Sequence, residues 1–102
     1  MTVKLVILYT KPDDINAFEA HYGNVHIPLV EALPGLQRWN SARVTDAADG
    51  GEHTLHRITE LHFTDPTSIQ AALRSPQGRA TGRDFRQIAP PGSRMFTATP
   101  GT

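Results

Sequence analysis

His26 is the side chain of this sequence best suited to moving a proton, and its neighbours suggest that a crevice lies beside it. Histidine has an ordinary pKa close to neutral pH, so it can act both as an acid and as a base. Pro28 follows two residues later and removes one N–H group from any helix through this region. A kink there would open a crevice for a substrate next to the imidazole. The alternative is a partly buried histidine that packs beside Leu29 and donates to a carbonyl freed by Pro28.

Two aromatic residues are candidate substrate contacts. Tyr22 lies one helical turn before His26, so its hydroxyl and ring can face the same crevice. An aromatic residue in this pattern is more often part of the core, which is the alternative for Tyr22. Trp39 is first a packing residue and second a ring on which an aromatic ligand could stack.

Asp84 is the candidate carboxylate partner of His26, and it would come from a second helical segment. In that position it would orient the imidazole or bind substrate. The alternative is a solvated carboxylate that pairs with a neighbouring arginine, Arg79, Arg83 or Arg86.

The five histidines do not have the spacing of a metal site. His56 and His62 would lie about 20 Å apart on one strand, whereas ligands of one zinc ion lie within about 4 Å of each other. His21 and His26 would lie about 140° apart around an α-helix. We therefore expect no metal. No phosphate loop or dinucleotide motif occurs either, so we expect no cofactor.

Composition excludes several classes of partner. The 102 residues carry 10 basic and 10 acidic side chains, so no basic field is available to attract nucleic acid or an anionic membrane. No apolar run approaches the roughly 20 residues of a membrane span. The start of the chain, MTVKLVILYTK, lacks the features of a leader, and we interpret it as a mature strand. The absence of cysteine fits a reducing cytoplasm.

Hydrophobic periodicity predicts six elements in a single domain, 1–102. Apolar side chains spaced three and four apart predict a helix from about 14 to 33, which Pro34 and Gly35 end. A second helical region is predicted in two pieces, which Ser75 and Pro76 separate. The predicted strands are 3–9, 36–44, 54–63 and 93–99, and the helical pieces after the third strand are 65–74 and 77–89.

The predicted order is strand, helix, strand, strand, helix, strand, which is the ferredoxin-like βαββαβ unit of the α+β class. Right-handed crossovers place both helices on one face of a four-stranded antiparallel sheet and leave the other face bare. A bare, partly apolar sheet face favours a partner sheet about 10 Å away. We therefore expect a homodimer that forms an α+β barrel. Simple alternation along 54–63 places His56, Ile58, Glu60 and His62 on one strand face. We expect Glu60 and His62 first in dimer or edge contacts and second as catalytic groups.

The sequence resembles the EthD domain family over nearly its whole length. The resemblance rests on Tyr9 and Pro12-Asp13 after the first strand, Phe18, Tyr22 and His26-x-Pro28-Leu29, Pro34-Gly35-Leu36, Glu60-Leu61-x-Phe63-x-Asp65, Ser75-Pro76 and Asp84. It implies the dimeric α+β barrel fold, and we expect Tyr9 as a further substrate contact. EthD was named for a requirement in bacterial ethyl tert-butyl ether degradation, and related superfamily members include cofactor-free monooxygenases, cyclases and isomerases. The family pattern assigns no role to His53, His56 or His62.

Two functions from different classes follow from these observations. The first is a small cytoplasmic enzyme without cofactor, of oxidoreductase, isomerase or cyclase type, that acts on a small hydrophobic or aromatic metabolite with His26 as acid or base. The second is a non-catalytic protein of a degradation pathway that holds such a molecule or stabilises an oxidoreductase partner. A cleft in which His26 and Asp84 both reach one ligand favours the enzyme, and a purely apolar cleft favours the binding protein.

Overall fold

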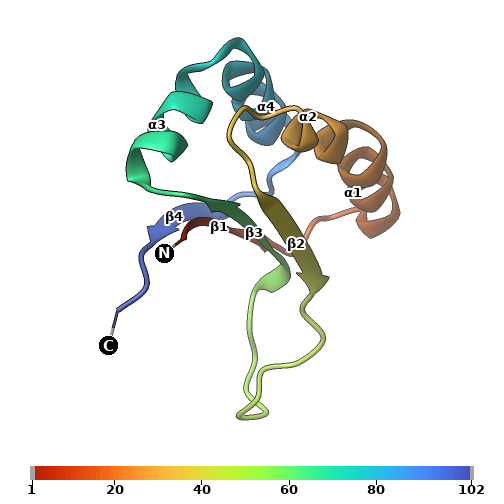
Figure 1. Cartoon of the computed structure of the whole chain (residues 1–102). Helices are drawn as coiled ribbons and strands as arrows, with labels where there is room; N and C mark the ends of the chain where they lie inside the picture. Colours follow the sequence, from red (N-terminus) through yellow and green to blue (C-terminus); the bar gives the residue numbers. More distant parts are fainter. Residues whose placement is uncertain (1, 102) are drawn as a thin grey trace.

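Four antiparallel strands form one sheet in the order β2-β3-β1-β4, which is the ferredoxin-like order. The computed structural model describes residues 2–101. All helices in this range lie on one side of the sheet (Figure 1). Its strands are β1 (Val3–Thr10), β2 (Arg38–Arg43), β3 (Leu55–Phe63) and β4 (Arg94–Ala98). The predicted fold class is confirmed, and the strand bounds differ from the predicted ones by at most two residues.

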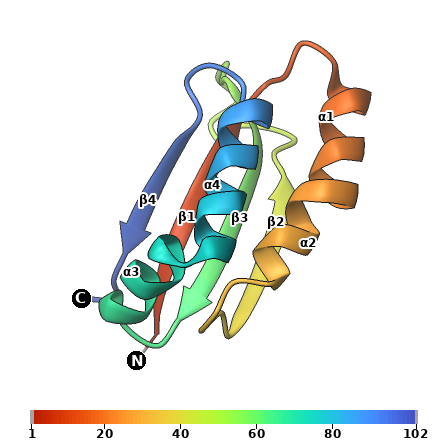
Figure 2. The same ribbon diagram turned by 90° about the horizontal axis from the view of Figure 1, so that it is seen from above.

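The first helical region is continuous in sequence but has three parts: α1 (Ile15–His21), η1 (Tyr22–His26) and α2 (Ile27–Glu31). The second region consists of α3 (Pro66–Arg74) and α4 (Pro76–Ile88). Viewed from above, α4 lies over the middle of the sheet, α1 and α2 lie toward β2, and β4 extends beyond the helices (Figure 2). None of the helices between residues 2 and 101 is long and apolar enough to span a membrane.

Residue alternation along the central strands builds the core. Val3, Leu5, Ile7 and Tyr9 of β1 are all buried. Their partners on β3 include Phe63, Leu61 and Thr59, which are also buried. Because side chains alternate along a strand, this set faces the helices and the intervening residues face the opposite side. The uncovered face therefore carries only half-buried or exposed apolar groups, such as Val6, Leu8, Ile58 and Phe96.

The first helical region contains a π-helical turn just before Pro28, where the sequence predicts a kink. The N–H of Ile27 donates to the carbonyl of Tyr22, five residues earlier, and the backbone angles on both sides remain helical. A π turn contains one residue more than an α turn, and such turns often occur at functional sites. The helix therefore continues past Pro28 with its side chains rotated relative to the α-helical pattern.

A β-bulge changes the direction of His56. Tyr9 pairs with Arg57 and Thr10 pairs with Leu55, so His56 has no partner residue on β1. The side chain of His56 is buried toward α1, where its Nε2 lies 2.8 Å from Glu19 Oε2. Simple alternation placed His56 on the face of Ile58, Glu60 and His62, and that prediction is wrong. The extra residue of a bulge turns a side chain to the other face.

Ser75 joins α3 to α4 and caps the second helix. The Ser75 hydroxyl oxygen accepts from the N–H of Gly78 at 2.9 Å. At Gly78 the two helices approach so closely that a Cβ atom would lie 2.0 Å from the carbonyl oxygen of Ala72. A Cβ at Gly82, one turn later, would meet only the end of the Arg86 side chain at 3.6 Å. Only the first of these two glycines is therefore required by packing.

We expect Gly78→Ala to lower the free energy of unfolding by about 1–3 kcal/mol or more, because the new methyl group meets rigid backbone. Gly82→Ala should instead stabilise it by up to about 1 kcal/mol through helix propensity alone. Urea denaturation of both variants measures these changes. Equal stabilities would mean that the joint between α3 and α4 accommodates a side chain.

Candidate functional site

A chain of hydrogen bonds links Tyr9, His26, Asp84 and His21 between the sheet and the helices. The Tyr9 hydroxyl lies 3.3 Å from His26 Nε2, and His26 Nδ1 lies 2.8 Å from Asp84 Oδ2. The other carboxylate oxygen, Asp84 Oδ1, lies 2.7 Å from His21 Nε2. Tyr9, His26 and Asp84 are buried, whereas His21 is partly exposed. This series of hydrogen bonds therefore runs from the protein interior to its surface.

The π turn explains why both histidines reach one carboxylate. His21 and His26 are five residues apart, and in an α-helix they would point in different directions. In a π turn the hydrogen bond joins residues five apart, so these residues take the place that residues four apart have in an α-helix. The sequence argument from a 140° separation was wrong, because it assumed α-helical geometry throughout. Within residues 2–101, however, no group of three histidine, cysteine, aspartate or glutamate side chains is arranged to hold a metal ion.

A donor and an acceptor can be assigned to the hydrogen bonds that link Tyr9, His26 and Asp84. Burial opposes ionisation of Asp84, but hydrogen bonds from His21 and His26 hold the pKa of the carboxyl below its ordinary value. An ionised carboxylate only accepts, so His26 donates through Nδ1 and keeps its lone pair on Nε2. That lone pair accepts from the Tyr9 hydroxyl, whose pKa is raised by burial and by Tyr22 and Asp84. Tyr9 is therefore a neutral phenol at neutral pH.

His26 is a neutral base in this arrangement. Burial lowers the pKa of His26 below its ordinary value, and the nearby His21 lowers it further. The hydrogen bond and charge of Asp84 act in the opposite direction and favour the protonated imidazole. At neutral pH the Nε2 atom therefore carries a lone pair, which accepts from the Tyr9 hydroxyl and can take up a proton once that hydroxyl is displaced, and Asp84 can stabilise the imidazolium that results.

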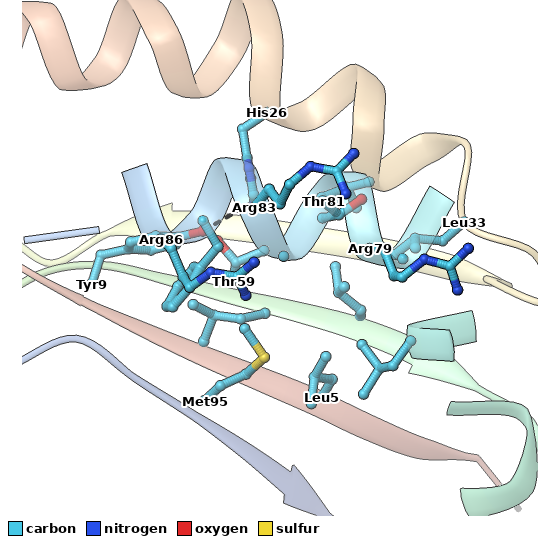
Figure 3. Close-up of a pocket in the computed structure, with 17 residues that line it drawn as sticks. Leu5, Tyr9, His26, Leu33, Thr59, Arg79, Thr81, Arg83, Arg86 and Met95 are labelled. Carbon is cyan, nitrogen blue, oxygen red and sulfur yellow. Dashed lines mark hydrogen bonds between the residues drawn. The ribbon is translucent and has the colours of Figure 1, made fainter. Parts of the chain in front are cut away.

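His26 and Tyr9 form part of the wall of a cavity of about 420 Å³, a size typical of small-molecule sites. Leu5, Ile7 and Leu61 of the sheet line it from below, and α2, α3 and α4 line it from above. Figure 3 shows Tyr9, Thr59 and His26 toward one end of the cavity and Leu5 and Leu33 toward the other. The cavity thus combines an apolar body with a polar end that carries the proton-transfer groups.

The predicted site residues take different positions around this cavity. Asp84 lies behind His26 and not in the wall, and its partners are the two histidines rather than an arginine. Tyr22 also lies behind the wall: its hydroxyl is 2.6 Å from Thr59 Oγ1 and 2.9 Å from Ser41 Oγ. Trp39 packs half-buried against the core and does not line this cavity. Of the predicted substrate contacts, only Tyr9 lies in the wall.

Sequence reasoning missed His21. The only signal in the sequence is its five-residue spacing from His26 across Gly23, shortly before a proline. Such a spacing brings two side chains together only if the helix contains a π turn. Since nothing in the sequence required that turn, the sequence left the second partner of Asp84 unassigned.

A second polar cluster supports the site from the side of α1. Glu19 accepts hydrogen bonds from His56 and from the guanidinium group of Arg57. Burial opposes ionisation of Glu19, but these two partners hold the pKa of its carboxyl below the ordinary value. Arg57 also lies over the Tyr22 ring, 4.8 Å from its centre, and donates to Ser41. The cluster therefore fixes Tyr22, which stacks against His26 with ring centres 5.8 Å apart.

We expect the His26 imidazole to titrate below its ordinary pKa of 6.5. Asp84→Asn should lower this pKa further, since the carboxylate favours the charged imidazole, and His21→Gln should raise it. Between the lowered pKa and 6.5 the unfolded chain binds a proton that the folded chain lacks, so this group costs stability as the pH falls through that window. NMR titration of the imidazole carbons measures each value. A His26 pKa above 6.5, or a rise in Asp84→Asn, would contradict this assignment.

Comparison with known proteins identifies the family. The EthD domain matches residues 14–90. An EthD family protein from Bacillus halodurans is 33% identical and superposes with a TM-score of 0.92, covering 99% of this chain and 100% of that one. An uncharacterized 11.0 kDa protein of Rhodococcus erythropolis is 29% identical over 91% of this chain and 89% of its own length.

A more distant structure shares only the fold. SnoaB, a cofactor-independent oxygenase from Streptomyces nogalater, is 18% identical and superposes with a TM-score of 0.72, covering 99% of this chain and 94% of that one. From its sequence match to residues 14–90 and its likeness to the Bacillus halodurans protein, this chain belongs to the EthD domain family.

Proposed function

We propose that this protein is a cofactor-independent enzyme that transfers a proton on a small apolar molecule. The observation that carries the proposal is the buried chain Tyr9–His26–Asp84 at the end of an apolar cavity. A neutral histidine that is held by a carboxylate through Nδ1 and keeps its lone pair on Nε2 is the usual arrangement of a general base. We place the activity in the cytoplasm, because a chain without cysteine does not need an oxidising compartment.

The reaction class best supported by these groups is proton abstraction next to a carbonyl group. The substrate takes the place of the Tyr9 hydroxyl at His26 Nε2, which then removes the proton from carbon. The electron pair moves onto the carbonyl oxygen, and the released Tyr9 hydroxyl can donate to that oxygen. Asp84 stabilises the imidazolium until the proton returns to the substrate or its product. An isomerase reaction needs only these proton transfers. A cyclase reaction also forms a carbon–carbon bond from the carbanion to a second carbonyl carbon of the same molecule, whose oxygen takes up the proton. An oxygenase reaction would use the same first step and would require molecular oxygen as co-reactant.

A binding or accessory protein is the alternative function. Most of the cavity wall is apolar, and Asp84 lies outside the wall, as expected for a site that only holds a ligand. The buried carboxylate favours the enzyme, because an apolar ligand gains nothing from an ionised carboxylate placed behind the wall. Burial of such groups costs stability unless they are fully hydrogen-bonded.

His26→Gln should lower proton transfer by about 10²- to 10⁴-fold, because glutamine keeps polarity and much of the volume but cannot exchange a proton near neutral pH. Deuterium uptake from D₂O into an apolar ketone such as 2-tetralone, followed by NMR, measures the rate without knowledge of the natural substrate. His53→Gln makes the same change in the β2–β3 connection and should leave the rate unchanged. If the wild-type protein binds 2-tetralone but exchanges no faster than the His26 variant, the binding function is favoured.

We also propose that two copies associate through the uncovered sheet faces. Phe96 lies on this face and is 39% exposed, beside Val6 of β1. His62 lies on the same face, and its Nε2 atom is already buried within one copy, 3.4 Å from Glu60 Oε1 and without a hydrogen-bond partner among residues 2–101. The proposal also accounts for apolar groups that a monomer of this size would leave in water.

Sedimentation at micromolar concentration should give about twice the chain mass of 11.2 kDa. Phe96→Asp should shift the protein toward the monomer, because the interface would then bury an unpaired carboxylate. Val25→Asp is the matched control, since Val25 is 43% exposed and lies on the helical side. A monomeric wild-type protein, or equal behaviour of the two variants, would exclude association through the sheet.

A further inference from the structure

Three arginines of α4 form a cationic stripe along the cavity. Arg79, Arg83 and Arg86 all line it, and their spacing of four and three residues places them on one side of the helix. All three side chains are exposed, and no carboxylate of residues 2–101 forms a salt bridge with any of them. In Figure 3 they are spread along the cavity, with Arg86 nearer Tyr9 and Arg79 nearer Leu33.

This positive charge is local and is not compensated by its own helix. The whole chain has no net charge, yet α4 contains three arginines and a single acid. That acid, Asp84, points inward, and both of its oxygens are engaged by histidines. The rim of an otherwise apolar cavity therefore carries three guanidinium groups. Arg79 donates through Nη1 to the carbonyl oxygen of Arg74 at 2.7 Å, whereas Arg83 and Arg86 have no hydrogen-bond partner among residues 2–101. Guanidinium groups bind carboxylates and similar oxyanions with two parallel hydrogen bonds.

We infer that the cavity accepts an apolar molecule that carries one anionic group, such as a carboxylate. This inference rests on the proposed function and narrows its substrate class. The apolar body lies against Leu5, Ile7 and Met95, and the anion lies at the rim on the arginine stripe. Anchoring at the rim fixes the orientation of the molecule, so that one carbon of the apolar body is presented to His26.

An alternative role for the stripe is packing. The methylene stems of arginine can cover apolar surface while the charged ends stay in water. In that case the cavity would not distinguish an anion from a neutral molecule of the same shape. The two roles are separated by a ligand pair that differs only in charge, and by salt, which weakens exposed ion pairs but not apolar contacts.

The test compares 8-anilinonaphthalene-1-sulfonate with N-phenyl-1-naphthylamine, which has the same ring system without the sulfonate. Fluorescence titration at low ionic strength should show the anion binding about 3- to 10-fold more tightly, the range expected for a few exposed ion pairs. The preference should disappear at 1 M salt, where the screening length is about 3 Å. The double variant Arg83→Gln, Arg86→Gln should lose the preference and keep its affinity for the neutral compound.

Arg43→Gln is the control, because it removes the same charge on β2 and lies outside the cavity. It should keep the preference, and so should His26→Gln, which would still bind but no longer exchange deuterium. Equal binding of the two probes to the wild type, or a preference that survives in the double variant, overturns the inference. Failure of the proposed enzyme is a separate result: deuterium exchange would be absent while the arginine-dependent preference remained.

Discussion

The candidate site depends on a single buried carboxylate that two histidines share. Asp84 comes from α4, and both histidines come from the first helical region, so these hydrogen bonds connect the two helical regions that cover the sheet. A buried carboxylate is costly unless its lone pairs are satisfied. His26 and His21 meet that requirement from one helix, with one imidazole inside the protein and one near its surface. The position of His26 Nε2 then follows from the carboxylate.

The π turn is the structural condition for this arrangement. Residues five apart converge only where the helix takes one extra residue per turn, and η1 provides such a turn immediately before Pro28. Proline cannot complete the ordinary α-helical hydrogen bond, so the backbone at this point already lacks one reason to remain α-helical. Gly23 lowers the helical preference further. The local sequence therefore weakens the α-helix where the site needs a different geometry.

The order of elements could be predicted from the sequence, but the inward direction of several side chains could not. The apolar run of β1 and the apolar stripe of the first helix both result from burial, and both predicted the observed elements. The π turn and the β-bulge at His56 each insert one residue into a regular pattern, and neither change leaves a periodic signal. For this reason the sequence did not predict the contact of His21 with Asp84, and it placed His56 on the wrong face. The pairing of His26 with Asp84 needed only the order of elements and was predicted.

Tyr22 shows how a residue near a site can be identified correctly while its contacts differ from those expected. Its ring stacks on His26 and meets Tyr9 edge to face with ring centres 5.6 Å apart. The guanidinium group of Arg57 also lies over the Tyr22 ring. Its hydroxyl is engaged by Thr59 and Ser41, so it has little freedom to turn toward a ligand. Aromatic contacts of this kind are directional and hold rings in fixed positions. The Tyr22 ring therefore packs against the imidazole behind the cavity wall, and the phenol hydroxyl at the cavity is that of Tyr9 on the sheet.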